Sequence, residues 1–423
     1  MRSTALRFLA ITPRVYLGDI YLHLVREGHE VRVFSFRPDI RAYCGLIDVV
    51  DDWRDELSWV GRDGIILVEG VMRGVLQDEL RADGYRVIGG SALGDRLETD
   101  RAFGQSVLER LGMPIAWNRV FKNPGEAGEW LRANPAAYVL KYDDNAHNTY
   151  VGDHPAGLDV LYALRRYPDA GRVLLMEKLG GVEVGIGAYF DGTEFLQPAC
   201  IDFEHKRFFD GDRGEMTGEM GTLASYEGAE RLFEATLGRV VPVLAGTGHV
   251  GYVNLNLMVD ERGAFPLEFT CRFGNPGFAV LAAMQTGGWG DLFSRMAAGA
   301  GGRFATVPGY SVAIVLTAPP FPAAYDVPPD EDPPVFFFDE PTGRERDYYH
   351  FVDMQCQDGQ LLAHRRSGHI MIVTGTGPDV ASAQVAAARR AKNVIVPEIR
   401  WRTDIGSRFL AGERDTLQRL GWL

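Results

Sequence analysis

Three side chains with oxygen donors, Asn256, Glu268 and Thr270, lie in one predicted hairpin that spans residues 251–276. Strand-forming residues flank a turn sequence at residues 260–263, which predicts two paired strands. Glu268 and Thr270 are two residues apart, so they point to the same face of their strand. A carboxylate and neutral oxygens suit Mg²⁺, which also keeps water and phosphate ligands. Taken alone, the pattern fits better with the solvent-facing side of an amphipathic hairpin, and both interpretations stay open.

Cationic side chains recur at positions where elements are expected to begin or end. Lys141 ends an apolar strand predicted for residues 138–141, so its charge must be solvated or paired. Arg101 stands in the first turn of a helix predicted within residues 97–116, where a surface position is the simpler interpretation. Lys206 and Arg207 lie in the segment 202–221, whose glycine and charge content predicts a loop. That loop carries either a site or a solvated charged surface.

A predicted strand, residues 173–177, runs into Lys178, Leu179 and two glycines before the next strand, residues 183–190. Such a hinge offers backbone amide and carbonyl groups to the edge of an adenine ring. Glu183 could then face ribose hydroxyl groups, although an exposed strand residue is the plainer alternative.

The elements before residue 100 alternate between short apolar strands and helices. Strands are predicted for residues 6–11, 30–35, 64–68 and 85–88, and helices for residues 19–27 and 75–82. This alternation predicts a doubly wound parallel sheet, which binds ligands beyond the carboxyl ends of its strands. The loop after the first strand, ITPRVYLGD, has a single glycine and lacks a GxGxxG pattern, so a dinucleotide site is not expected.

The composition places further bounds on function. The chain has 423 residues, 46% of them hydrophobic, and therefore two to four folding units. No apolar run approaches the ~20 residues of a membrane span, and the first residues lack a signal peptide, so a cytoplasmic location is expected. The net charge of −13 does not indicate a general nucleic-acid binder. Four scattered cysteines, Cys44, Cys200, Cys271 and Cys356, are expected to be reduced.

Beyond residue 300, a proline-rich passage at residues 319–334 is expected to be a connector. It is followed by a strand predicted for residues 369–374 and a helix for residues 380–392, a compact α+β unit.

Several motifs occur in an order that resembles the phosphoribosylamine–glycine ligase family of the ATP-grasp superfamily. They are LETDRAF at a helix start, a strand ending in lysine, MEKLGGVEV, an HKR…D…G…TG.MG segment, LEFTCRFGNP, and the closing segment SGHIMIVTGTGPDVASAQVAAARRAKNVIVPEIRWRTDIGSR. Each match alone is weak, but the ordered set over most of the chain is strong evidence for the fold.

The resemblance implies an α/β and α+β multidomain protein with an ATP-grasp fold. The expected parts are an N-terminal pre-ATP-grasp doubly wound domain at residues 1–97, an ATP-grasp domain at 98–305 with a lid subdomain at about 117–186, and a small C-terminal α+β domain at 306–423.

The resemblance also implies the roles of individual residues in an ATP-dependent ligase that forms an amide through an acyl phosphate. Phosphoryl transfer needs positioning and charge neutralisation. ATP would be bound by Arg101, Lys141, Glu177, Lys178, Leu179 and Glu183; Mg²⁺ by Glu268, Thr270 and Asn256; the substrates by Asp212, Thr217, Gly218 and Asn275; and Arg272, Lys206 and Arg207 would be catalytic.

The chain departs from the family pattern in the metal pair, the lid loop and the substrate loops. Thr270 replaces an asparagine, Asn256 stands where related enzymes use a carboxylate, and Arg101 replaces a lysine. The lid sequence DDNAHNT, residues 143–149, lacks the family's glycines, so Asn145, His147, Asn148 and Thr149 would have to supply phosphate donors. The substrate loops read TPRVYLGD, VEGVMRG and, at residues 215–221, EMTGEMG.

These departures favour a ligase that joins glycine, another amino acid or a small carboxylate to an amine other than phosphoribosylamine. The first alternative is the housekeeping phosphoribosylamine–glycine ligase reaction of purine synthesis. A second alternative is a nucleotide-binding protein that has lost catalysis. A monomer or homodimer is expected in each case.

Overall fold

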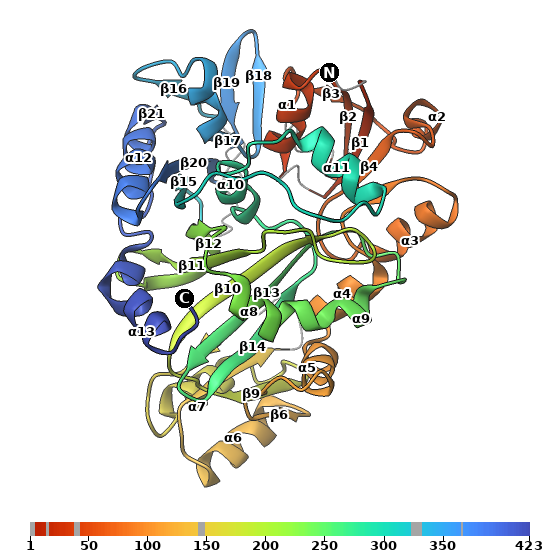
Figure 1. Cartoon of the computed structure of the whole chain (residues 1–423). Coiled ribbons are helices and arrows are strands. Elements are labelled where there is room, and N and C mark those ends of the chain that lie inside the picture. The colour runs from red at the N-terminus through yellow and green to blue at the C-terminus, as the bar shows by residue number, and fades with distance from the viewer. Residues whose placement is uncertain (1–4, 14–16, 38–42, 143–148, 323–331, 365–366) are drawn as a thin grey trace.

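The structure is a computed structural model that describes residues 5–13, 17–37, 43–142, 149–322, 332–364 and 367–423 (Figure 1). Three sheets carry the architecture: a parallel sheet near the N-terminus, a large antiparallel sheet in the centre, and a small antiparallel sheet at the far end from the N-terminus. The described residues contain no helix with the length and apolar character needed to cross a membrane. All four cysteines are free thiols, as predicted.

The N-terminal unit is the predicted doubly wound parallel sheet, with strand order β3-β2-β1-β4-β5. The central strand β1 is buried on both faces, because Phe8 and Ala10 pack toward α1 and α11, while Leu9 and Ile11 pack toward α2 and α3. The elements are β1 (Arg7–Thr12), α1 (Gly18–Arg26), β2 (Glu30–Ser35), β3 (Asp48–Val49), α2 (Leu57–Val60), β4 (Ile65–Val68), α3 (Gly74–Ala82), β5 (Val87–Ile88) and, from later in the chain, α11 (Trp289–Ala297).

The helix predicted within residues 97–116 is confirmed as α5, and a separate helix, α4, ends just before it. Helix α4 (Ala92–Thr99) ends at Asp100, and α5 (Arg101–Arg110) begins there. The Asp100 side chain accepts a hydrogen bond of 3.0 Å from the Phe103 amide, which caps α5. This cap places Arg101 at the first position of α5.

A small four-stranded antiparallel sheet with order β6-β9-β7-β8 follows, covered by two helices whose apolar residues form one cluster with it. Its elements are β6 (Asn118–Phe121), α6 (Pro124–Ala133), β7 (Tyr138–Tyr142), β8 (Tyr150–Val151), α7 (Leu158–Arg166) and β9 (Val173–Glu177). These elements fall within the residues predicted for a lid subdomain, about 117–186, and that role stays a prediction. Residues 143–148, including Asn145, His147 and Asn148, lie outside the described residues.

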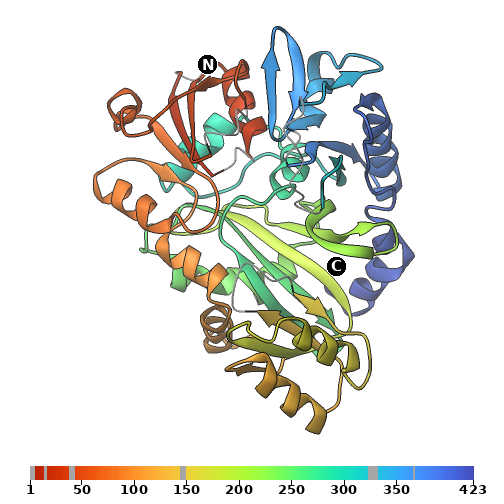
Figure 2. The ribbon, with the colours of Figure 1, turned by 180° about the vertical axis from the view of Figure 1, so that it is seen from behind.

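The central sheet has eight strands in the order β14-β13-β10-β11-β12-β15-β20-β17. Its strands come from the middle and from the C-terminal part of the chain, so β15 and β20 continue the sheet past residue 305 (Figures 1 and 2). The predicted domain boundaries stay predictions. The strands are β10 (Val182–Phe190), β11 (Cys200–Phe209), β12 (Arg213–Ser225), β13 (Gly251–Asp260), β14 (Gly263–Thr270), β15 (Tyr310–Thr317), β17 (Tyr349–Phe351) and β20 (His369–Gly377).

The prediction of a loop for residues 202–221 is wrong. Most of that segment forms the paired strands β11 and β12, in the register Asp202↔Ala224, Glu204↔Thr222 and His205↔Gly221. Polar residues alternate with Ile201, Phe203 and the buried His205, so the charged side chains occupy one face and the other face is buried. The glycine and charged residues of this segment therefore belong to one face of the sheet and to the turn between its two strands.

The predicted hairpin at residues 251–276 is confirmed by β13 and β14. Asn256 pairs with Glu268, and Asn254 pairs with Thr270. Residues that face each other across antiparallel strands share a face, and so do residues two apart. All four side chains therefore lie on one side of the sheet.

The remaining elements complete the core behind and beside the central sheet. Helix α12, which was predicted for residues 380–392, packs its alanine-rich face on β15 and β20. These elements are α8 (Glu230–Ala235), η1 (Leu237–Val240), α9 (Val241–Leu244), α10 (Gly277–Ala282), β16 (Phe336–Phe337), η2 (Gly343–Tyr348), β18 (Met354–Gln357), β19 (Gln360–Ala363), α12 (Val380–Asn393), β21 (Val394–Ile395), η3 (Phe409–Glu413) and α13 (Arg414–Arg419).

Candidate active site

A cleft of ≈ 760 Å³ separates the small antiparallel sheet from the hairpin β13–β14. Val139, Met176 and Leu179 line it from the small sheet and its following hinge, and Met258 and Leu267 line it from the hairpin. The two apolar walls belong to one packed cluster. A narrow apolar slot with polar groups at one end suits a planar base joined to a charged tail.

The hinge after β9 is in the place expected for contact with a base, but part of its hydrogen-bonding capacity is already used. The Glu177 amide donates to Trp117 O at 2.8 Å, and the Lys178 amide donates to Ala137 O at 3.3 Å. The amide groups of these two residues are therefore not free to donate to a ligand. The side chain of Lys178 pairs with Asp153, and that of Glu177 lies 3.7 Å from an Arg262 nitrogen.

Lys206 is the centre of the charged end of the cleft. Its Nζ lies 2.7 Å from Glu183 Oε1, 3.0 Å from Glu204 Oε2 and 3.8 Å from Glu268 Oε1. Burial opposes its charge, but the three carboxylates together raise its pKa well above the ordinary value. Lys206 is therefore a permanently charged group held at the junction of β10, β11 and β14.

Glu268 is surrounded by cations. Its Oε2 accepts from Arg101 Nη1 at 2.6 Å, and Lys206 and Lys141 lie nearby. Burial alone would raise its pKa, yet Lys206, Lys141 and Arg101 lower it well below the usual range. Lys141 is only 7% exposed, and burial lowers its pKa to about 8 despite the attraction of Glu268. The carboxylate is ionised at neutral pH, whereas Lys141 titrates just above it.

Arg272 is held by a carboxylate that sequence reasoning did not single out. Glu98 of α4 accepts from Arg272 Nε at 3.2 Å and from the Cys271 amide at 2.8 Å. Two contacts from one carboxylate fix both the backbone and the guanidinium of this segment. Glu98 was visible in the motif LETDRAF, but nothing in the sequence linked it to Arg272.

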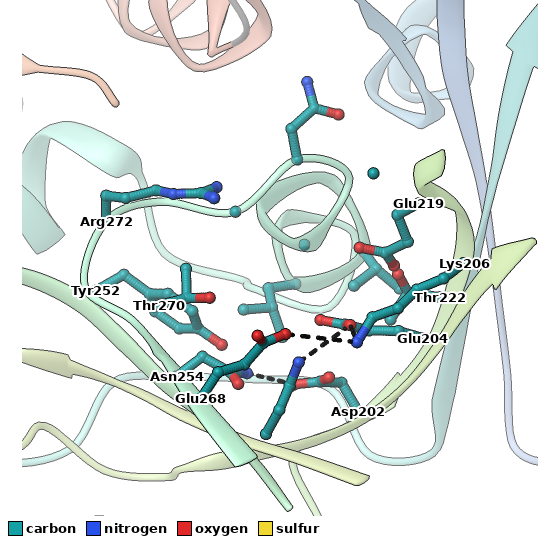
Figure 3. Close-up of a pocket in the computed structure, with 17 residues that line it drawn as sticks. Asp202, Glu204, Lys206, Glu219, Thr222, Tyr252, Asn254, Glu268, Thr270 and Arg272 are labelled. Carbon is teal, nitrogen blue, oxygen red and sulfur yellow. Dashed lines mark hydrogen bonds and ion pairs between the residues drawn. The ribbon is translucent and has the colours of Figure 1, made fainter. Parts of the chain in front are cut away.

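A second pocket of ≈ 200 Å³ adjoins the cleft, between one face of the central sheet and α10 (Figure 3). It shares five lining residues with the cleft: Lys206, Gly218, Glu268, Thr270 and Arg272. Its other polar lining residues are Asp202, Glu204, Glu219, Thr222, Tyr252, Asn254, Asn256 and Asn275. The two spaces therefore meet at a charged centre.

Two glycines of β10 make room beneath this pocket. A Cβ at Gly185 would lie 2.2 Å from Asp202 Oδ1, and a Cβ at Gly187 would lie 1.8 Å from the Tyr252 hydroxyl oxygen. Both distances are far inside van der Waals contact, so a side chain on either residue would displace a polar group of the pocket. Because these two positions of β10 carry no side chain, side chains of β11 and β13 can lie across the strand there.

The pocket contains carboxylates that were not predicted. Burial, followed by repulsion from Glu204, raises the pKa of Asp202, and burial raises that of Glu219 well above its ordinary value. The alternation in Asp202, Glu204 and Lys206 is a strand signal that could have located the first two of these acids. Their density of charge instead suggested a loop.

The C-terminal segment holds β11 in place on both sides of Lys206. Arg408 donates to Glu204 O at 2.7 Å, Arg402 donates to Arg207 O at 2.9 Å, and the Gly406 amide donates to His205 Nε2 at 3.2 Å. Arg402 is fully buried. This segment had been associated with a family motif, without a role for its residues.

Arg207 and Asp212 line neither of the two pockets, and their predicted roles in catalysis and substrate binding stay predictions. Arg207 Nη1 donates to Gly214 O at 2.8 Å. The Asp212 carboxylate accepts from Arg402 at 2.8 Å and from Arg408 at 3.0 Å. Both residues connect the β11–β12 turn to the C-terminal segment, so they stabilise the site from outside the two pockets.

The other predicted site residues are brought together. Thr217, Gly218 and Asn275 line the pockets, and Thr217 Oγ1 donates to Lys206 O at 2.7 Å. Asn256 Nδ2 donates to Glu204 Oε2 at 3.3 Å, which turns its amide oxygen away from that carboxylate. Every predicted ATP-binding residue lines the cleft.

The predicted metal ligands fit a hard cation through their donor atoms. Glu268 offers a carboxylate, and Asn256 and Thr270 offer neutral oxygens on the same face of the sheet. A bound cation would compete with Arg101 and Lys206 for Glu268. Within the described residues, no three Asp, Glu, His or Cys side chains group as a metal centre, so such an ion would depend on phosphate and water for its other ligands.

Comparisons with known proteins agree with this geometry. Residues 99–278 match the family model of the phosphoribosylglycinamide synthetase ATP-grasp (A) domain. The phosphoribosylamine–glycine ligase of Streptomyces coelicolor is 28% identical over 417 residues, covering 90% of this chain and 97% of that protein. The enzyme of the same name from Caulobacter vibrioides is 29% identical over 391 residues, covering 86% of each.

Solved structures show the same fold. The phosphoribosylamine–glycine ligase of Thermotoga maritima superposes with a TM-score of 0.74 at 21% identity, covering 95% of this chain and 100% of that chain. A biotin carboxylase from Campylobacter jejuni gives a TM-score of 0.64 at 13% identity, covering 97% and 98%.

The fold and the cleft define an ATP-grasp enzyme, an ATP-dependent ligase that forms a carbon–nitrogen bond. Within that superfamily, residues 99–278 match the phosphoribosylglycinamide synthetase ATP-grasp (A) domain, and the chain is similar over most of its length to phosphoribosylamine–glycine ligases. The predicted fold class is confirmed, and the predicted resemblance to this family agrees with these matches.

Proposed function

We propose that the protein activates the carboxylate of an amino acid with ATP and joins the resulting acyl phosphate to an amine, with glycine and phosphoribosylamine as the first pair to test. The observation that carries this proposal is the meeting of two pockets at Lys206, Glu268 and Arg272. One pocket has the apolar walls expected for a base, and the other has the polar lining expected for a small substrate.

The chain's own residues supply positioning and charge for phosphoryl transfer. Lys141 and Lys206 would contact the phosphates of ATP, while Glu183 would bind ribose. Arg272, held by Glu98, would stabilise charge on the acyl phosphate as the γ-phosphoryl group passes to the substrate carboxylate. The amine nitrogen would then attack the acyl carbon, releasing phosphate and forming the amide.

Magnesium would be held by Glu268 with Thr270 and Asn256. When bound, such an ion neutralises charge on the phosphates of ATP. Arg101, which contacts Glu268 at 2.6 Å, would then be released toward the nucleotide.

The names of the relatives favour phosphoribosylamine and glycine over the different amine that the sequence departures had favoured. A different amine remains the second candidate because Asp202 and Glu219 place two carboxyl groups in the substrate pocket. The third idea, a protein without catalysis, loses support from the joint placement of Lys141, Glu183, Glu268 and Arg272 around one cleft.

The test is incubation with ATP, Mg²⁺ and a panel of amino acids, with hydroxylamine trapping of the acyl phosphate and ADP release as readouts. Trapping with glycine, followed by amide formation with phosphoribosylamine, is the expected result. Rescue of a strain that lacks phosphoribosylamine–glycine ligase would support the same pair in cells. ATP binding without turnover on any carboxylate or carboxylate–amine pair would reject the ligase proposal, and turnover only with another amine would select the second candidate.

A further inference from the structure

Two of the four cysteines meet where the N-terminal unit contacts the hairpin β18–β19, which lies beside α1 in both views of the fold (Figures 1 and 2). Cys44 lies in the turn before β3, and Cys356 lies in β18. The Cys356 amide donates a hydrogen bond of 2.9 Å to Cys44 O. More than three hundred residues separate the two cysteines in the sequence, so only the folded chain brings them together.

The interface around the two cysteines is held by contacts that do not involve sulfur. Tyr43, at the start of the turn, is fully buried. Its amide donates to Met354 O at 2.5 Å, and its hydroxyl group donates to Phe351 O. In the same interface, the buried Asp19 carboxylate lies 2.7 Å from His350 Nδ1. These contacts hold the turn against the C-terminal strands, so the two thiols are kept near each other before any covalent bond forms.

The backbone of the turn gives the two cysteines a spacing that suits a disulfide. Leu46 N donates to Tyr43 O at 2.9 Å, which places Cys44 and Gly45 at the two central positions of the turn. A direct backbone hydrogen bond keeps the Cα atoms of its two residues about 5–6 Å apart. Disulfides join Cα atoms that are about 4.4–6.8 Å apart. A Cβ at Gly45 would lie 3.5 Å from Cys356 Cβ, so the side chain of Cys356 leaves the backbone on the side of the turn.

The four cysteines differ in their access to solvent. Cys44 and Cys356 are half-buried, whereas Cys200 and Cys271 are 1% and 3% exposed. Gly45, next to Cys44, also lines an open cavity of ≈ 500 Å³. Burial raises the pKa of the Cys200 and Cys271 thiols well above the ordinary value, so both stay protonated and unreactive. An oxidant in solution can therefore reach the pair at the interface but not the two buried thiols.

We propose that Cys44 and Cys356 form a reversible disulfide that joins the N-terminal unit to the hairpin β18–β19. The oxidant is a small-molecule disulfide. One cysteine thiolate attacks it, forming a mixed disulfide and releasing one small thiol; the second cysteine thiolate then attacks the protein sulfur of that mixed disulfide and releases the other small thiol. Two protein thiols are oxidised, one small disulfide is reduced, and the two protons of the cysteines pass to the released thiols.

The disulfide would act on the interface between two parts of the fold. Neither cysteine lines the cleft or the adjoining pocket, and the chain segment between the cysteines carries the residues of both. A cross-link that closes a long segment stabilises a protein mainly by restricting its unfolded chain, so the oxidised form should unfold at a temperature at least about 3 °C higher than the reduced form. Oxidation would thus change stability without altering a pocket residue.

The experiment uses the full-length protein. It is reduced, freed of reductant, incubated with oxidised glutathione, and then alkylated under denaturing conditions. Peptide mapping should find Cys44 linked to Cys356 with Cys200 and Cys271 alkylated, and dithiothreitol should return all four cysteines to the alkylated form. Thermal unfolding of the two forms should show the expected rise. Lasting glutathione adducts without the link, a link between two chains, full alkylation after oxidation, or an unchanged unfolding temperature would overturn the inference.

Two variants assign the effect to this pair of thiols. Cys44→Ser removes one sulfur and keeps a small side chain, so both the link and the rise in unfolding temperature should be lost. Cys356→Ser should give the same result and serves if the first variant does not fold. Gln357→Ser is the matched control, because it places a serine at the neighbouring exposed position of β18 and keeps both thiols. A rise that persists in both cysteine variants, or that is lost in Gln357→Ser, would overturn the inference.

Discussion

The cleft that would hold the nucleotide and the pocket that contains Asp202 and Glu219 are adjacent, but their ionisable groups are arranged in opposite ways. In the cleft, Glu268 and Lys206 neutralise each other and their neighbours through contacts between 2.6 and 3.8 Å. In the pocket, Asp202 and Glu219 each have one buried oxygen without a hydrogen-bond partner. Charges that are already paired can keep their positions until a ligand binds that is the same in every reaction cycle, such as ATP. The buried carboxyl groups of the pocket instead favour their neutral form, because burial raises the pKa of both.

Glu268→Gln is the change expected to disturb the cleft most. It removes the carboxylate that balances Arg101 and Lys206 and that would hold Mg²⁺, so Mg²⁺-dependent turnover should fall by at least about 100-fold. Circular dichroism and thermal unfolding should show a folded protein. Turnover equal to that of the wild type would remove Glu268 from the proposed metal site.

Lys141 offers a test by pH. Its pKa of about 8 means that it carries its charge below pH 8 and loses it above, so ATP should bind more weakly as pH rises. The loss between pH 7 and 9 should be at most about tenfold, because one group titrates. Lys141→Arg should flatten the profile, since arginine stays charged. Calorimetry with the ATP analogue measures both, and an equally steep profile in the variant would assign the pH dependence to another group.

Glu98→Gln should have a smaller effect, because it changes only how firmly Arg272 is positioned. The amide can still accept from Arg272, but it loses the charge that holds the guanidinium. We expect kcat to fall about tenfold while KM for ATP stays within about twofold. A change confined to KM would show that Glu98 supports nucleotide binding instead.

Asp212→Asn should leave the chemistry of both pockets intact. Asp212 joins Arg402 and Arg408 outside them, so we expect a loss of about 1–3 kcal/mol in the free energy of unfolding. The folded variant should retain wild-type kcat. A loss of activity that exceeds the loss of folded protein would restore Asp212 to the substrate site.

The contrast between the cleft and the adjoining pocket also describes what the sequence could predict. The cleft follows from short local patterns: a strand ending in Lys141, the hinge at Lys178 and Leu179, and the hairpin that carries Glu268. The parallel sheet near the N-terminus follows from its alternating elements in the same way. The structure places these residues together, and their roles remain predictions.

The pocket that contains Asp202 and Asn254 depends on strand pairing between distant segments, which a local pattern does not report. Asp202 and Asn254 meet only because β11 and β13 lie on either side of β10, where Gly185 leaves room. The charge of residues 202–221 also suggested a loop, although their alternation matched a strand. The register of strand pairing decides which side chains meet in such a site, and the whole sheet fixes that register.

The clamp of Arg402, Gly406 and Arg408 on β11 has a consequence for biosynthesis. During translation, Lys206 leaves the ribosome nearly two hundred residues before the groups that fix its strand. The nascent chain can form its parallel sheet and its small lid sheet early. Its ability to consume ATP should arise only when synthesis has passed residue 408, which protects a growing chain from idle hydrolysis.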